Sequence, residues 1–373
     1  FPALSEEEKN DVRRIANEGF QQARLAASAR IIKSDIDACL ECGIREILIF
    51  TPFNELNLHY RLKMTKEQVL EKTVESIQYA KEHRATANFV LEDASRTPLE
   101  EILQIFETAV KAGADRIAIA DTVGFLRPLS MRYLISHIKE SLSQLIDKEI
   151  PLSVHCHNDF GLATANTLAA VEEGLSYVHT CVAGFGERAG VAPLEEVVSA
   201  LELLYNIDTG LDMRKLYRLS QLAEKSFALP IQDHKPIVGE NAFSYEVDEH
   251  VHGMLAHPLI YEPFPPEIIE RQTMFYIGRQ TGRHFVESRL ASAGIKATPQ
   301  QIDEIVRKIR GIQESLDKGG TQMTFYQIKK LMRELRKGLT EEDFWKIVEQ
   351  VTGQKPKASL TSGTGKTADT SQQ

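Results

Sequence analysis

The sequence predicts an α/β protein, namely a TIM-type (β/α)8 barrel that lacks its first two strands in this chain and is followed by a mostly helical C-terminal region. Extended apolar runs alternate with amphipathic runs in six consecutive units, roughly 20–40 residues apart, which is typical of a parallel sheet flanked by helices. Polar residues also cluster at the C-terminal ends of successive strands, and in a barrel these ends converge on one mouth. The two missing strands are expected before Phe1.

The individual elements follow from apolar periodicity and helix signals. A Ser5–Glu8 capping pattern predicts a helix before the first strand. Several helices end in glycine, as at Gly43, Gly113 and Gly174. A doubly wound sheet is the alternative, but no Gly-x-Gly-x-x-Gly motif follows the first strand. Strands are predicted at 25–29, 46–50, 87–91, 116–120, 152–155 and 177–183, and helices at 66–83, 99–112 and 163–173.

The βα alternation stops near residue 206, so we assign residues 1–206 to the barrel. Residues 207–290 mix short helical runs with proline-rich loops and are predicted to form a post-barrel linker subdomain. Residues 291–351 carry apolar positions at helical spacing and are predicted as a helical C-terminal subdomain. Residues 352–373 have few apolar residues and are predicted to be a disordered tail.

Composition and charge exclude several classes of protein. No run approaches the roughly 18 apolar residues of a membrane-spanning helix, so no membrane partner is expected. The chain has 44 basic and 53 acidic residues and a net charge of −9, which argues against nucleic acid as a partner. The four cysteines favour reduced thiols in a cytoplasmic protein. Cys39 and Cys42 form a lone Cys-x-x-Cys near a helix end, for which we do not expect a metal or redox role.

His155 and His157 are the strongest candidate site residues. At positions i and i+2 of a strand, both imidazoles point the same way and suit a divalent ion. The alternative is a pair of histidines that only hydrogen-bond at a strand end. Asn158 and Asp159 follow directly at the predicted end of the strand, which favours metal binding.

Other strand ends carry further candidates. Glu92 is predicted to be a site carboxylate, whereas Asp93 and Arg96 are more simply explained as a structural ion pair. The hydroxyl of Thr122 can hold a substrate carboxylate. Arg188 lies in the polar cluster after the sixth strand, and we assign it to substrate binding.

Several motifs, taken together, resemble the isopropylmalate synthase/homocitrate synthase family over residues 1 to about 290. The motifs agree in order and spacing with this family, whose members are metal-dependent barrels that condense acetyl-CoA with a 2-oxo acid and hydrolyse the thioester. They are Glu92–Arg96 (Glu-Asp-Ala-Ser-Arg), His155–Ala163 (His-Cys-His-Asn-Asp-Phe-Gly-Leu-Ala), Gly186–Gly190 (Gly-Glu-Arg-Ala-Gly), Pro193–Val197 (Pro-Leu-Glu-Glu-Val) and Lys235–Gly239 (Lys-Pro-Ile-Val-Gly).

The resemblance assigns roles to particular residues. It implies that His155 and His157 bind a divalent metal (Mg, Mn or Zn), with Thr122 on the carboxylate of the 2-oxo acid. Glu92 then belongs to the catalytic pocket. A histidine from the region after the barrel takes part in family members, and the matching position is His250, with His252 as its neighbouring competitor. The implied partners are acetyl-CoA, a 2-oxo acid and a second copy in a homodimer.

The chain also departs from the family pattern. The Asp-Arg-Asp/Glu motif of strand one, which supplies an acidic metal ligand and an arginine, is absent from the sequence. Val191 replaces a usual Asn, Asn54–Asn57 replaces Ser-Asp-Ile-His, and Tyr245–His250 replaces His-Glu-Ser-Gly-Ile-His. We therefore expect a homocitrate or 2-isopropylmalate synthase-like enzyme. The alternatives are a related synthase using pyruvate or oxaloacetate, and an inactive truncated homologue. A retro-aldol lyase is disfavoured because no cysteine follows Cys181.

Overall fold

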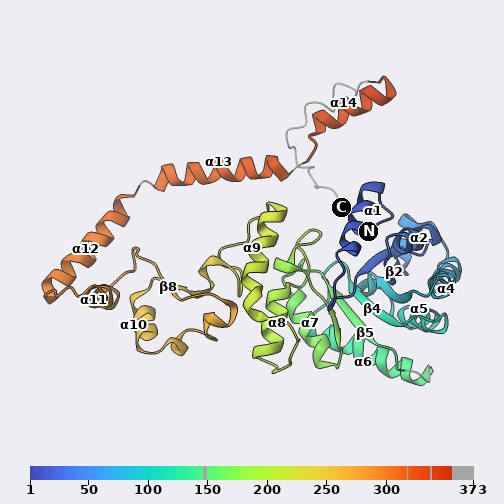
Figure 1. Ribbon diagram of the computed structural model, residues 1–373, viewed down its shortest axis with the longest axis horizontal. Coiled ribbons are helices and arrows are strands. Elements are labelled where there is room, and N and C mark those ends of the chain that lie inside the picture. The colour runs from blue at the N-terminus through green and yellow to red at the C-terminus, as the bar shows by residue number, and fades with distance from the viewer. Residues whose placement is uncertain (146–148, 317, 337, 355–373) are drawn as a thin grey trace, which may run out of the picture. The chain divides into compact units, whose positions relative to one another are not determined.

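The computed structural model describes residues 1–145, 149–316, 318–336 and 338–354 and divides the chain into two compact units (Figure 1). The first unit comprises Phe1–Tyr245 and Gly253–Phe275. The second comprises Glu246–His252 and the chain from Tyr276 onward. Each unit is described below by itself. Most of the predicted tail, residues 355–373, lies outside the described residues.

A six-stranded parallel sheet forms the centre of the first unit. Each strand pairs with the next strand along the chain, and all five pairings are parallel. This order confirms the predicted α/β class and the six consecutive units. The strands are β1 (Ala26–Arg30), β2 (Glu46–Pro52), β3 (Thr86–Glu92), β4 (Arg116–Asp121), β5 (Leu152–Cys156) and β6 (Tyr177–His179).

Helices connect the strands and pack beside one another. Contacts join α4 to α5, α5 to α6, α6 to α7 and α7 to α8, so these helices cover one face of the sheet in chain order (Figure 1). The helix before β1 is capped by Ser5, whose side chain accepts from the amide of Glu8, as predicted. The helices are α1 (Glu6–Asn17), α2 (Lys33–Glu41), α3 (Glu55–Asn57), α4 (Lys66–Glu82), α5 (Leu99–Lys111), α6 (Pro128–Leu145), α7 (Ala163–Glu172) and α8 (Leu194–Leu203).

The two faces of the sheet differ in chemistry because side chains alternate along each strand. The face toward the helices is apolar: Phe89 of β3 is fully buried and meets Phe106 of α5 edge to face, with ring centroids 6.2 Å apart. The opposite face carries polar groups, among them Asn88, which donates to Glu46 at 3.0 Å, and His155. The core therefore lies between sheet and helices, and the other face is left for chemistry.

The last strand is shorter than predicted. The apolar run 177–183 suggested one strand, but β6 ends at His179 and a 3-10 turn follows at Val182–Gly184. Ala183 adopts the left-handed conformation with φ of 56°, which an extended strand does not allow. The amide of Cys181 also bonds to the carbonyl of Ala192 at 3.1 Å, and this directs the chain into a closed loop.

The remaining elements follow the barrel-like part of the chain. In the first unit, Phe243 and Ile269 form a small apolar cluster with Leu216 of α9, and two short parallel strands pair with each other. Among the described residues, none of the helices has the length and apolar character of a membrane-spanning segment. The elements are α9 (Leu216–Phe227), β7 (Ser244–Tyr245), α10 (Asp248–Ala256, which crosses the unit boundary), β8 (Met274–Phe275), and in the second unit α11 (Arg283–Ser292), α12 (Pro299–Ser315), α13 (Lys318–Arg336) and α14 (Glu341–Thr352).

The packing of Phe106 against the sheet yields a stability prediction. We expect Phe106→Ala to lower the free energy of unfolding by about 3–5 kcal/mol, because it removes a fully buried ring and leaves a cavity. Urea unfolding followed by circular dichroism measures the change. Leu204→Ala, at a side chain that is 79% exposed, is the control and should change the value little. An equal, small effect of both variants would contradict this core.

Candidate functional site

The candidate site lies along the carboxyl ends of the strands. Because all six strands are parallel and in chain order, these ends share one edge of the sheet. Strand register places Ala120 beside His155, and His155 beside His179 of β6. Glu92 and Asp93 lie at and just after the end of β3. The structure thus brings most of the predicted site residues to one edge.

The two predicted histidines are neighbours in space. The Nε2 atoms of His155 and His157 lie 3.2 Å apart, and their ring centroids are 5.0 Å apart. A third imidazole, His179, has its ring centroid 5.6 Å from that of His155. Sequence reasoning missed His179, because the predicted strand 177–183 placed this residue in the interior of the strand, whereas β6 ends at His179.

Burial keeps these imidazoles in the neutral form. It lowers the pKa of His155 to about 3, with further lowering from the nearby His179 and His157. The pKa of His157 is lowered mainly by burial and then by Arg188, and that of His179 by burial and then by Arg116. At neutral pH each ring therefore keeps a nitrogen lone pair available.

The histidine pair fits a divalent metal as two of its ligands. Two imidazole nitrogens bound to one zinc ion, each at about 2.1 Å, lie no more than about 4.2 Å apart, and the observed 3.2 Å falls within this limit. The Nδ1 atom of His157 is buried and has no hydrogen-bond partner among the described residues. No group of three or more His, Cys, Asp or Glu side chains in the described part of the chain could hold a metal ion.

Glu92 is bound by an arginine that sequence reasoning missed. The guanidinium of Arg61 donates two bonds to the Glu92 carboxylate, at 2.5 and 2.9 Å. Arg61 lies in a single π-helical turn, Leu58–Leu62, a feature found frequently at functional sites. The two residues are 31 positions apart, so nothing in the sequence pattern pairs them.

Asp93 is the centre of a second, buried cluster. Arg96 binds its carboxylate at 2.7 and 2.8 Å, which confirms the predicted structural ion pair. The side-chain amides of Asn54 and Asn57 donate to the same carboxylate at 2.7 and 2.9 Å. Asp93 has φ of 59°, a conformation that these bonds hold in place. The two asparagines that depart from the family pattern thus fix the loop that follows Glu92.

Thr122 and Arg188, both predicted to bind substrate, meet at the backbone of Thr122. The Thr122 hydroxyl accepts from the amide of Asp93 at 2.8 Å. Arg188 donates to the Thr122 carbonyl at 2.6 Å and to both oxygens of Asp159 at 2.8 Å. Its guanidinium lowers the pKa of Asp159. One chain of contacts thus joins the ends of β3, β4 and β5.

His250 belongs to the second unit and is described apart from the residues above. It is an exposed residue of α10. Beside it, the ring of His252 stacks on that of His284 at 4.0 Å, and His284 bonds to Asp248 through Nδ1 at 2.8 Å. Burial opposes ionisation of Asp248, but the bonds from His284 and the backbone together lower its pKa. The competitor His252 is therefore engaged in a local cluster.

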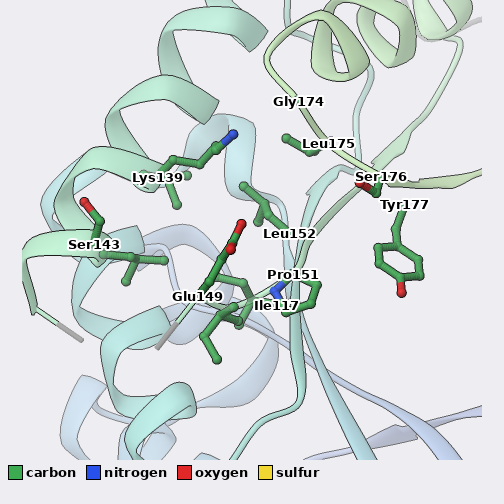
Figure 2. Close-up of a pocket in the computed structure, with 13 residues that line it drawn as sticks. Ile117, Lys139, Ser143, Glu149, Pro151, Leu152, Gly174, Leu175, Ser176 and Tyr177 are labelled. Atoms are coloured by element: carbon green, nitrogen blue, oxygen red, sulfur yellow. The ribbon is translucent and has the colours of Figure 1, made fainter. Parts of the chain in front are cut away.

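A cavity of about 770 Å³ lies at the opposite ends of the strands (Figure 2). It is lined by Ile117, Leu152 and Tyr177, each at or near the start of β4, β5 or β6, and by Lys139 of α6. Lys139 donates to the Glu173 carbonyl at 2.8 Å. Because the histidines lie at the other ends of these strands, the cavity is not part of the candidate site.

Two protein families match consecutive parts of the chain. The family described as HMGL-like matches residues 1–223, and the one described as Homocitrate synthase post-HMGL domain-like matches residues 237–318. These matches bear out the resemblance drawn from the motifs.

Similar proteins agree with these families. The 2-isopropylmalate synthase of Methanocaldococcus jannaschii is 40% identical over 357 residues, which cover 95% of this chain and 64% of that relative. The chain thus spans less than two thirds of that relative's length. Homocitrate synthase AksA of Methanothermobacter thermautotrophicus is 39% identical over 335 residues, covering 89% of this chain and 83% of the relative. Hydroxymethylglutaryl-CoA lyase from Pseudomonas aeruginosa shares the fold, with a TM-score of 0.55 at 20% identity over 62% of this chain and 79% of that one.

The lowered pKa of His155 yields a prediction for the metal-free protein. Because its pKa of about 3 lies below the value of about 6.5 in an unfolded chain, the unfolded state takes up the proton first as the pH falls. We expect this group to contribute a loss of about 2 kcal/mol in the free energy of unfolding between pH 7 and pH 5.

Urea unfolding at both pH values, with a chelator present, measures this contribution. His155→Asn should show a smaller loss than the wild type, and His83→Asn, at an exposed histidine on the end of α4, should show the same loss as the wild type. If the wild type and His155→Asn lost the same free energy of unfolding between the two pH values, the assignment of a neutral, buried His155 would be refuted.

Proposed function

The chain belongs to the HMGL-like family, and on that premise we propose that it condenses acetyl-CoA with a 2-oxo acid and hydrolyses the resulting thioester. The observation that carries the proposal is the pair of neighbouring imidazoles, His155 and His157, at the carboxyl ends of the strands. The relatives named 2-isopropylmalate synthase and homocitrate synthase support the same class of reaction.

His155 and His157 hold a divalent metal ion in this proposal, with magnesium, manganese and zinc as the candidates. Polarisation of the ketone carbonyl of the 2-oxo acid is the chemistry that a bound ion supplies. The chain's contribution is to keep both rings neutral by burial and to fix them side by side before a substrate arrives.

Thr122 and Arg188 bind the carboxylate of the 2-oxo acid. The Thr122 hydroxyl oxygen already accepts from the amide of Asp93, and the hydroxyl donates only a long hydrogen bond to the Ala120 carbonyl, with the two oxygens 3.5 Å apart. The hydroxyl proton is therefore available to an incoming carboxylate. Arg188 is half-exposed and adds a positive charge beside it, fixed in place by Asp159.

Condensation also needs a base that removes a methyl proton from the thioester and creates a carbon nucleophile. We assign this step to His250, with Glu92 as a carboxylate of the catalytic pocket. Arg61 fixes the orientation of the Glu92 carboxylate through its two bonds, so this group faces a substrate with little freedom to rotate.

The possible forms of this proposal differ in the 2-oxo acid that serves as the substrate. We place homocitrate or 2-isopropylmalate synthase-like condensation first, and a related synthase that uses pyruvate or oxaloacetate second. The protein is proposed to act as a homodimer, which sedimentation velocity tests directly. An inert homologue is the contrary case, and the assay below distinguishes it.

The first functional prediction concerns the histidine pair. With a divalent metal supplied, we expect release of free CoA from acetyl-CoA in the presence of one of 2-oxoglutarate, 2-oxoisovalerate, pyruvate or oxaloacetate. His155→Asn and His157→Asn should each lower kcat/KM at least about 100-fold, because loss of a ligand removes several kcal/mol of charge stabilisation.

Thiol detection of released CoA measures the rates, and His83→Asn is the matched control, expected to stay near the wild-type value. Absence of CoA release with all four acids would refute the proposed synthase activity. Full activity of His155→Asn would refute its role as a metal ligand.

The second functional prediction separates His250 from its neighbour. We expect His250→Ala to lower kcat by about 10²–10⁴-fold, because a proton acceptor is lost, while Co²⁺ binding measured by calorimetry stays unchanged. His252→Ala should remain within about twofold of the wild type, since its ring stacks on His284 and serves packing. If His252→Ala lowered kcat more than His250→Ala did, His252 would be assigned as the base in place of His250.

A further inference from the structure

Lys235 lies between two acidic side chains in the first unit, remote in sequence from the candidate site. Its ammonium is 2.9 Å from an oxygen of Glu196 and 3.3 Å from an oxygen of Glu195. The Lys235 side chain is 14% exposed and that of Glu195 only 1%. The second oxygen of Glu196 accepts from the hydroxyl of Thr164 at 2.7 Å. A lysine from the segment after α9 thus offsets two adjacent carboxylates of α8, one of them fully buried.

The buried carboxylate of Glu195 reaches the loop after β6. Its second oxygen accepts from the amide of Ala183 at 3.0 Å. Ala183 is a non-glycine residue with φ of 56°, a conformation that costs on the order of 1–3 kcal/mol and persists only where neighbouring groups hold it. The hydrogen bond from its amide to Glu195 is such a constraint.

The loop that begins near Ala183 runs directly against the second histidine. We call residues 181–193 the β6 loop. Its Gly190 carbonyl accepts from the amide of Asn158 at 2.9 Å, and Val191 forms an antiparallel bridge with His157. A Cβ atom on Gly190 would lie 2.0 Å from the Gly184 carbonyl, so the loop is closed with no spare room. The same loop carries Arg188.

We propose that Lys235 is a positioning residue that, through Glu195 and the Ala183 amide, holds the β6 loop in the conformation that fixes His157. The inference rests on the proposed function in taking His157 as a metal ligand. Without the lysine, a buried, unpaired carboxylate would remain beside a second one, and such a group is strongly destabilising. We expect Glu195 to shift toward water in response, which releases the Ala183 amide. Groups behind a metal ligand commonly change metal affinity by about 10–100-fold.

The test uses Lys235→Met in the full chain, with two readouts. Hydrogen exchange followed by mass spectrometry should show at least about tenfold faster exchange in peptides of the β6 loop, while peptides of β1 and α2 stay unchanged. Co²⁺ affinity, from calorimetry, should weaken about tenfold. Lys225→Met, at an exposed lysine of α9, is the matched control and should match the wild type in both.

Two further variants keep the test decisive if Lys235→Met folds poorly. Lys235→Arg retains the charge and should keep both readouts near the wild type. The double variant Glu195→Gln with Lys235→Met removes both charges but keeps an oxygen for the Ala183 amide. It should recover most of the protection that Lys235→Met loses. Absence of that recovery would contradict a route through Glu195.

The outcomes separate this inference from the proposed function. Unchanged loop exchange in Lys235→Met overturns it. Faster exchange with unchanged Co²⁺ affinity reduces Lys235 to a structural role and also overturns it. A wild-type chain that binds no Co²⁺, or binds it as well after His155→Asn, refutes the metal site instead. In that case, hydrogen exchange of the β6-loop peptides alone decides whether Lys235 stabilises the loop.

Discussion

Parallel pairing of six strands in chain order is the constraint on which the rest of the structure depends. It places the carboxyl ends of all six strands at the same edge of the sheet. Because side chains alternate along each strand, every second residue points to the face away from the helices. His155 and His157 point together for this reason, and strand register adds His179 beside them. Because that region is partly buried, the imidazoles stay neutral, which is the form of a histidine that can bind a metal ion.

Around the histidines, the edge is organised by arginine–carboxylate pairs. Arg61 binds Glu92, Arg96 binds Asp93, and Arg188 binds Asp159. In each pair the guanidinium is the more exposed partner. The site thus carries fixed, oriented charges that largely cancel one another, so that only a ligand placed close to one arginine feels a strong field. Such an arrangement favours recognition of small anions at defined points over general attraction of polyanions.

Local features of the fold were predictable, and the pairings that define the site were not. Five of the six strands were predicted to within about two residues, because each is a short apolar run between helix signals. The histidine pair was predictable because spacing i, i+2 on a strand is a local rule. By contrast, Arg61 and Glu92 are 31 residues apart, and Lys235 and Glu196 are 39 apart. Such contacts follow from strand order and register, which a single sequence does not encode in its pattern. The left-handed turn at Ala183 was missed because alanine carries no signal for it.

The alternation that aims the histidines also makes β5 intolerant of changes in its length. Gain or loss of one residue between Leu152 and His155 would move every later side chain of the strand to the opposite face of the sheet, so both imidazoles would turn toward the apolar layer and Cys156 would turn away from it. A conservative replacement in this strand alters one contact, whereas a frame-preserving insertion or deletion would dismantle the whole edge. Variation among relatives in this segment should therefore consist of exchanges and be free of gaps.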